Sequence, residues 1–156
     1  MAARAPEGPR VRVAALIMLE GKVVVVRHRA GASTYHLLPG GGVDYRETLE
    51  DALVREVAEE TGLRIEVGRP LVINDTIDPR GTRHVVNITF ESKAVGGEIT
   101  SHPKDARVEA VELISPGTLT ELDFRPPIAE ALAAFLTADG GPALYLGSVF
   151  TDGPSG

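Results

Sequence analysis

The sequence contains no cysteine and no tryptophan, and aromatic residues make up only 4% of its 156 residues. The lack of cysteine excludes disulfides, thiolate nucleophiles and cysteine-ligated zinc or iron–sulfur centres. No apolar run approaches the roughly 18–20 residues that a membrane-spanning helix needs, and the first residues lack the apolar segment of a secretory signal. With 43% hydrophobic and 24% charged residues, the composition is globular. We therefore expect a soluble cytoplasmic protein with no membrane partner.

Positive charge is also scarce. The chain has 16 Lys and Arg residues against 22 Asp and Glu residues, which gives a net charge of −6 and an isoelectric point near 5.2. This balance argues against a protein that coats a nucleic-acid polymer. A nucleotide-type small molecule is still allowed as a substrate, because a bound divalent cation can reverse the local charge.

The length predicts one domain, over residues 11–156, preceded by a disordered arm over residues 1–10. Apolar runs at 11–19 and 22–26, separated by Glu20 and Gly21, predict a hairpin. A loop is expected over 29–34. Further strands are expected at 65–67, 71–73, 85–91 and 108–114.

Helix signals are clearest after residue 47. Thr48 followed by Asp51 is typical of a helix start, and Gly62 of a helix end. A second helix is expected at 127–137, followed by a last short strand or a docked tail at 143–150. This order of elements predicts an α+β sandwich.

Acidic residues crowd the first of these helices. Between Asp44 and Glu60 there are seven acids and two arginines, so this segment carries −5 of the net charge of −6. At 100° per residue, Glu56, Glu59 and Glu60 fall within about 100° of the helix circumference. Glu60 shares its sector with the apolar Leu53, so the acids continue the stripe that faces the protein. Like charges at this spacing repel each other, and a divalent cation is the counter-charge that carboxylates suit.

A glycine run, residues 40–42, leads toward this helix and allows close approach of a ligand or a metal. Gly41, then Glu47, then the segment 55–63 match the pattern GX5EX7REUXEEXGU, in which U is apolar. Seven fixed matches have a chance probability on the order of 10⁻⁸ at a given start. The sequence therefore resembles the Nudix hydrolases, and the order of its elements is similar to the α/β/α sandwich with a mixed sheet of that family.

The resemblance implies hydrolysis of a nucleoside diphosphate linked to another moiety, with Mg²⁺ or Mn²⁺ as cofactor. It also implies the metal ligands, which are Glu56, Glu59, Glu60 and the carbonyl of Gly40, with Glu47 as support or as ligand of a second ion. Arg55 would orient these acids by ion pairing.

The same resemblance implies a general base but allows two positions for it. It belongs either to the helix, as Glu59 or Glu56, or to the later loop of residues 96–109, where Asp105 is one of three acids together with Glu98 and Glu109.

Candidate substrate contacts are Arg27 and Arg29 at the end of the second strand, Gly41, and Arg80, since guanidinium groups suit phosphates. Pro79, sixteen residues beyond Leu63, resembles a marker of ADP-ribose pyrophosphatases in the family, although a simple turn at residues 78–81 explains it equally well. With tryptophan lacking, base stacking falls to an aromatic residue. The candidates are Tyr35, Tyr45, Tyr145 and Phe90, of which Phe90 is better explained as core.

ADP-ribose or a related nucleotide sugar is the substrate that we expect, with AMP and a sugar phosphate as products. Two alternatives stay open: cleavage of (d)NTPs to a monophosphate and pyrophosphate, and a catalytically silent module that binds a nucleotide. The resemblance also makes a homodimer plausible.

Overall fold

A computed structural model describes residues 8–138 and 141–151 of the chain. The first seven residues of the predicted N-terminal arm lie outside this part, and the first strand already begins at Arg10. The elements in chain order are β1 Arg10–Leu19, β2 Lys22–Ala30, β3 Ser33–Leu37, β4 Gly40–Gly42, α1 Leu49–Thr61, β5 Leu63–Ile77, β6 His84–Gly97, β7 Val108–Ile114, the short 3₁₀ helix η1 Pro116–Glu121, α2 Ala129–Thr137 and β8 Leu144–Ser148.

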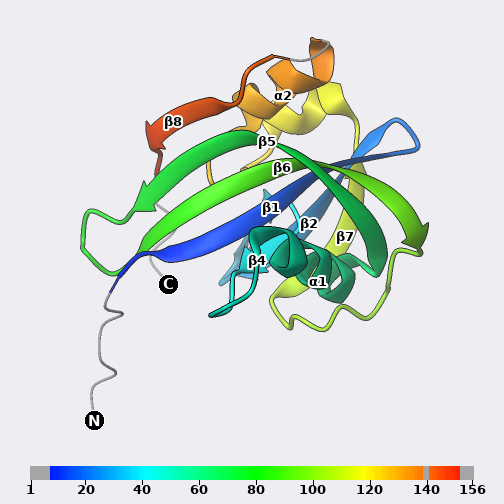
Figure 1. The fold of residues 1–156 in the computed structure, drawn as a ribbon, viewed down its shortest axis with the longest axis horizontal. Helices are drawn as coiled ribbons and strands as arrows, with labels where there is room; N and C mark the ends of the chain where they lie inside the picture. Colours follow the sequence, from blue (N-terminus) through cyan, green and yellow to red (C-terminus); the bar gives the residue numbers. More distant parts are fainter. Residues whose placement is uncertain (1–7, 139–140, 152–156) are drawn as a thin grey trace.

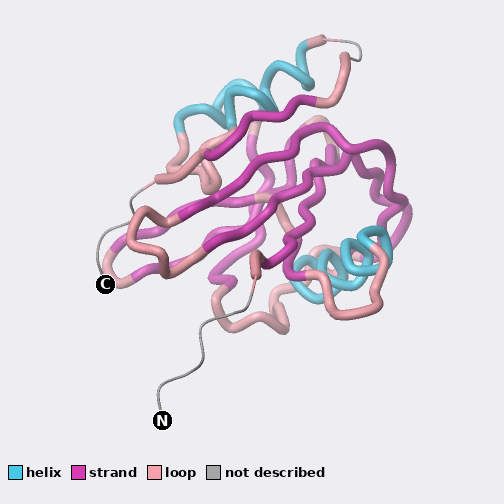
Figure 2. Tube along the Cα trace, turned by 60° about the vertical axis from the view of Figure 1, so that its left-hand side comes forward, coloured by secondary structure: helices cyan, strands magenta, loops and turns pink. Residues whose placement is uncertain are grey.

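The strands form a mixed sheet in the order β3-β2-β1-β6-β5-β8, and β4 and β7 pair with β1 and β2 respectively. The pairs β1–β6 and β5–β8 are parallel, whereas the other pairs are antiparallel. The helices α1 and α2 lie on opposite sides of these strands (Figures 1 and 2). The α+β sandwich expected from the sequence is therefore confirmed.

The core has two halves because β1 is buried on both of its faces. Val13 and Ile17 pack toward α1 with Leu53, whereas Leu16 packs toward α2 with Leu132. The sequence of a strand that is covered on both faces is continuously apolar, and the segment 13–17 is such a run. The central sheet is thus a rigid platform between the two helices.

The predicted hairpin and first helix are present with the expected ends. Glu20 and Gly21 both have positive φ, which suits a tight two-residue turn. The Thr48 hydroxyl accepts a hydrogen bond from the amide of Asp51, and Gly62 ends α1 in the left-handed conformation.

Two segments differ from the sequence prediction, and at a third, 143–150, the short strand is the alternative that is confirmed. The expected loop over 29–34 is wrong, because β2 continues to Ala30 and β3 begins at Ser33. The expected strands 65–67 and 71–73 are one strand, β5, with register shifts around Pro70 where it pairs with β6. The segment 143–150 contains a true strand, β8, that adds in parallel to β5.

Candidate active site

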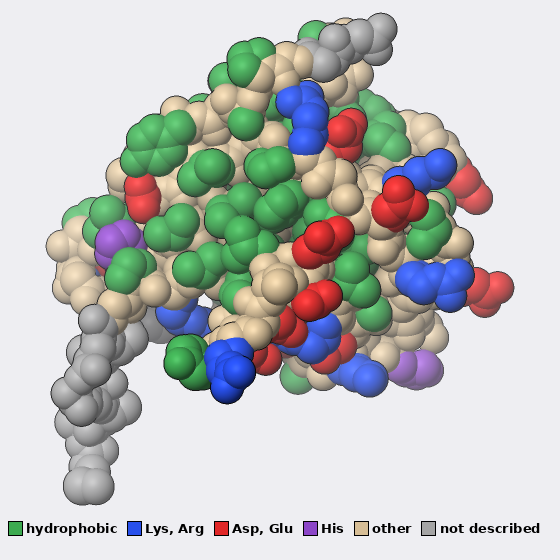
Figure 3. Space-filling view, in the orientation of Figure 1, with side chains coloured by type: hydrophobic (Ala, Val, Ile, Leu, Met, Phe, Trp, Pro, Cys, Tyr) green, Lys and Arg blue, Asp and Glu red, His purple; other side chains and the backbone are tan. Residues whose placement is uncertain are grey.

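The candidate active site lies where β4 passes beside α1. A side chain at Gly40 would overlap the backbone of Val13 and Ala14, and one at Gly41 would overlap the carboxylate of Glu56. Gly40 therefore lets β4 lie close against β1, and Gly41 lets it touch the acidic helix directly. Charged side chains gather over and beside α1, whereas apolar ones cover the neighbouring sheet (Figure 3).

Glu60 is the most deeply buried acid of the helix, with 2% of its surface exposed. Its Oε1 accepts a hydrogen bond of 2.9 Å from the amide of Gly40. Burial raises the pKa of Glu60 to about 7, against the lowering effects of this hydrogen bond and of nearby Arg12; the charges of Glu56 and Asp105 act in the same direction as burial. Because burial disfavours the charged form of Glu60, a bound cation would stabilise its carboxylate.

Arg55 organises the remaining acids of the site. Its Nε and Nη2 each lie 2.8 Å from a carboxylate oxygen of Glu47, and its Nη1 lies 2.8 Å from Oε1 of Glu56 and 3.7 Å from Oε2 of Glu59. The hydrogen bonds from Arg55 lower the pKa of Glu47 to about 2, and the same bonds raise the pKa of Arg55. Arg55 therefore contacts the carboxylates of Glu47, Glu56 and Glu59, and its orienting role stays a prediction.

The segment between β6 and β7 closes over the end of α1. The amides of Thr100 and Lys104 donate to the carbonyls of Thr61 and Glu59. Asp105, in this segment, accepts two hydrogen bonds from the Arg107 guanidinium, and these bonds lower its pKa. The charge of Asp105 also raises the pKa of Glu60, so this loop acid acts electrostatically on the acids of α1.

The donor set fits a hard divalent cation. Among residues 8–138 and 141–151, no three acidic or histidine side chains converge in a metal-binding arrangement. Arg55 holds Glu47 and Glu56, and Gly40 holds Glu60. Carboxylate and carbonyl oxygens are nevertheless the ligands that Mg²⁺ and Mn²⁺ prefer. A Cβ at Gly41 would overlap the Glu56 carboxylate, so glycine at this position lets that carboxylate lie against β4.

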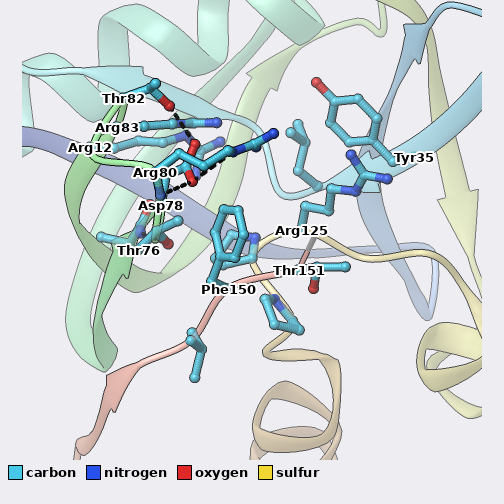
Figure 4. Close-up of a pocket in the computed structure, with 15 residues that line it drawn as sticks. Arg12, Tyr35, Thr76, Asp78, Arg80, Thr82, Arg83, Arg125, Phe150 and Thr151 are labelled. Atoms are coloured by element: carbon cyan, nitrogen blue, oxygen red, sulfur yellow. Dashed lines mark hydrogen bonds and ion pairs between the residues drawn. The ribbon is translucent and has the colours of Figure 1, made fainter. Parts of the chain in front are cut away.

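A cavity of about 400 Å³ is rich in arginine and includes Arg12 of β1 in its lining. Among the described residues, four arginines and a single acid line it, and this acid, Asp78, is held by Arg80 and Thr82. Arg12 connects the cavity to the acids, because it lines the cavity and also interacts electrostatically with Glu60. Figure 4 shows Arg12, Arg80 and Arg83 on one side of Phe150, and Arg125 and Tyr35 on the other.

The other sequence-predicted substrate contacts are placed unevenly. Arg80 lines the cavity, and Pro79 lies in the expected turn between β5 and β6 without lining it. Arg27 and Arg29 instead form ion pairs with Glu109 of β7, at 2.9 Å and 2.6 Å, so this arginine pair is already neutralised. Of the stacking candidates, Tyr35 lines the cavity, whereas Phe90 packs in the core, as expected.

Sequence reasoning missed three residues of the cavity, which are Arg12, Arg125 and Phe150. Arg12 carried a usable signal, since it is a charged residue inside the apolar run of the first strand. Its guanidinium donates to the carbonyl of Leu38, 3.0 Å away. No comparable signal marked Arg125 or Phe150.

The fold and the site define a class of protein. The family model described as NUDIX domain matches residues 8–135, and the protein belongs to this family of hydrolases. An ADP-ribose pyrophosphatase of Methanocaldococcus jannaschii is 34% identical over 108 residues, which are 67% of this chain and 63% of that protein, so the chain spans just under two thirds of its length. A MutT-like protein of Streptomyces ambofaciens is 35% identical over 76% of this chain and 72% of its own. The crystal structure of a NUDIX hydrolase from Nitrosomonas europaea has the same fold, with a TM-score of 0.72 at 23% identity over 94% of this chain and 81% of that one.

Within the described residues, no helix is long and apolar enough to cross a membrane. Enzymes of the Nudix family act on nucleotide-type substrates and generally use divalent cations. Both properties agree with a cluster of carboxylates beside an arginine-lined cavity.

Replacement of Arg55 by Ala is expected to lower kcat about 10- to 100-fold and to weaken Mn²⁺ binding, because Glu47 and Glu56 lose their common partner. Arg55→Lys should be nearly as impaired, since one ammonium cannot reproduce the fork on two carboxylates. Steady-state kinetics and a Mn²⁺ titration test this. The control is Arg64→Ala, an exposed arginine of β5. Unchanged kcat and unchanged Mn²⁺ affinity in Arg55→Ala would contradict the orienting role.

Proposed function

We propose that the protein hydrolyses the pyrophosphate bond of ADP-ribose or a related nucleotide sugar, with Mg²⁺ or Mn²⁺ as cofactor, to give AMP and a sugar phosphate. One observation carries this proposal: the acids of α1 and the arginine-lined cavity are joined through Arg12, which interacts with Glu60 and lines the cavity. Acids that suit metal ions and arginines that suit phosphates would then act on the same ligand.

Glu56, Glu59 and Glu60, with the carbonyl of Gly40, are the groups that would hold the cation, and Glu47 would support them through Arg55. When bound, the cation neutralises charge that develops on the pyrophosphate. In the reaction, a water oxygen forms a bond to one phosphorus and the bridging P–O bond breaks, so each product keeps one phosphate. Of the residues that line the cavity, Arg12 and Arg83 would bind the phosphates of the substrate.

The proton of the attacking water goes to a carboxylate. Glu59 supports this role by its exposure, because 40% of its side chain is accessible and Arg55 is 3.7 Å away. Asp105 is the alternative, held ionised by Arg107. The Glu59→Gln and Asp105→Asn variants separate the two, since only loss of the base removes the acidic limb of the pH–rate profile.

Product analysis tests the proposed reaction. The purified protein with Mg²⁺ is expected to convert ADP-ribose to AMP and ribose 5-phosphate faster than it cleaves any (d)NTP, and chelation by EDTA should abolish the activity. Chromatography of the products over a panel of ADP-ribose, nucleotide sugars, dinucleoside polyphosphates, NADH and (d)NTPs gives the ranking. Nucleotide binding without turnover of any substrate would contradict the enzymatic proposal and would favour the silent module.

A second candidate function is the cleavage of (d)NTPs to a monophosphate and pyrophosphate. It is favoured by the similarity to a MutT-like protein over 76% of the chain. Release of pyrophosphate as the fastest reaction in the same panel would support this candidate over ADP-ribose. Homodimer formation and a cytoplasmic location stay predictions from the sequence.

A further inference from the structure

The C-terminal segment after β8 forms one wall of the arginine-lined cavity. Val149, Phe150 and Thr151 line it together with residues from β1, β3 and the turn between β5 and β6. The segment reaches this place because β8 pairs in parallel with β5. The pairing is extended by the amide of Val149, which donates to the carbonyl of Asp75 at 2.9 Å. The residue after this hydrogen bond, Phe150, therefore has a defined position at the cavity.

The arginines that line the cavity favour the binding of an anion. Arg12 and Arg83 interact electrostatically with each other, and Arg12 also interacts with the acids Glu60 and Glu56. Within the described part of the chain, Arg83 has no carboxylate partner, and Asp78 is held by the turn that contains Arg80. A phosphate in this cavity would meet the Arg83 guanidinium beside that of Arg12. Phe150 lies between these arginines and Arg125 in Figure 4, so the rest of such a ligand would extend toward its ring.

Two aromatic rings line the cavity, and they differ in what they contact. Tyr35 is already engaged on its ring, with the Arg125 guanidinium 4.4 Å from the ring centroid and the His28 ring in an edge contact at 5.4 Å. Phe150 has no ring or cation contact among the described residues, and it is only half-buried. Its ring is thus the aromatic surface that a ligand can still cover.

We propose that Phe150 is a specificity-determining residue on which the nucleobase of the substrate stacks, while Arg12 and Arg83 bind its phosphates. The C-terminal segment is then part of the substrate site and not only a cover for the sheet. Stacking on an aromatic ring binds any base through its flat face, so the segment selects for a nucleotide over a base-free phosphate. This inference rests on the proposed function for the identity of the substrate.

Kinetics of Phe150 variants test the proposal. Because stacking on a ring is worth roughly 1–3 kcal/mol, Phe150→Ala is expected to raise KM for ADP-ribose about 5- to 150-fold with kcat changed less than about threefold. Phe150→Leu keeps apolar bulk and should be similarly impaired, whereas Phe150→Tyr should restore most of the affinity. The control is Tyr145→Ala, an aromatic residue of β8 that is 70% exposed and does not line the cavity.

Calorimetric binding of AMP and of ribose 5-phosphate separates this inference from the proposed function, because it needs no turnover. Phe150→Ala should weaken AMP and leave ribose 5-phosphate unchanged. Equal AMP affinity in the wild type and Phe150→Ala would overturn the stacking role, and so would equal weakening of both ligands or a full rescue by Phe150→Leu. A wild type that binds AMP through Phe150 without hydrolysing ADP-ribose would instead overturn the proposed function alone.

Discussion

Glu60→Gln is expected to reduce hydrolysis about 1000-fold, which corresponds to about 4 kcal/mol of transition-state stabilisation. The amide has the shape of the carboxylate, and its oxygen can still accept the hydrogen bond that Gly40 donates at 2.9 Å. The variant should therefore keep the fold and lose the negative charge that a metal ion requires. Glu56→Gln should show a loss of similar size, because its carboxylate lies against Gly41 on the same side of the helix.

The measurement is kcat/KM at saturating Mg²⁺, together with a thermal denaturation curve for each variant. Glu50→Gln is the matched control, since Glu50 lies on the same helix but is exposed and occupies a variable position of the GX5EX7REUXEEXGU pattern. Activity of folded Glu60→Gln within tenfold of the wild type would contradict the assignment of this acid to the metal site.

The second large effect is on stability as a function of pH in the metal-free protein. The pKa of Glu60 is raised from 4.5 to about 7 by burial, so the folded state holds a proton that the unfolded state releases between these pH values. Protonation of Glu60 in the folded state contributes to the free energy of unfolding. This contribution is fully present below pH 4.5 and is lost as the pH rises through 7. The free energy of unfolding should fall by about 3 kcal/mol over this range from this group.

Other titratable groups also change the free energy of unfolding with pH, and comparison with Glu60→Gln isolates the contribution of Glu60. Burial lowers the pKa of His28, so its contribution rises with pH, opposite to that of Glu60. The lowered pKa values of Glu47 and Asp78 act below about pH 4.5. Urea unfolding in EDTA at pH 5 and pH 8 should therefore show a much larger fall for the wild type than for Glu60→Gln. Added Mg²⁺ should shrink the wild-type fall, and equal falls in both proteins would contradict the prediction.

Local physics explains why the acidic helix could be predicted so well. The cap at Thr48, the stop at Gly62 and the 100° spacing of Glu56, Glu59 and Glu60 are properties of adjacent residues. The burial of Leu53 and Glu60 on one stripe follows from the same spacing. Leu49, one turn before Leu53, is 36% exposed, because the packing of the helix end depends on the sheet beneath it.

The sequence by itself determined the family, the acidic helix and the glycines that meet it, since each depends on spacing along one short segment. Only the tertiary structure decided which arginine side chains can bind a substrate and which are paired with carboxylates of the protein. The pairing of β2 with β7 brings Glu109 to Arg27 and Arg29, whereas Arg12 and Arg125 come to one cavity from opposite ends of the chain. The parallel addition of β8 to β5 likewise placed Phe150 at that cavity. Long-range strand pairing sets these contacts, and no local pattern of residues encodes it.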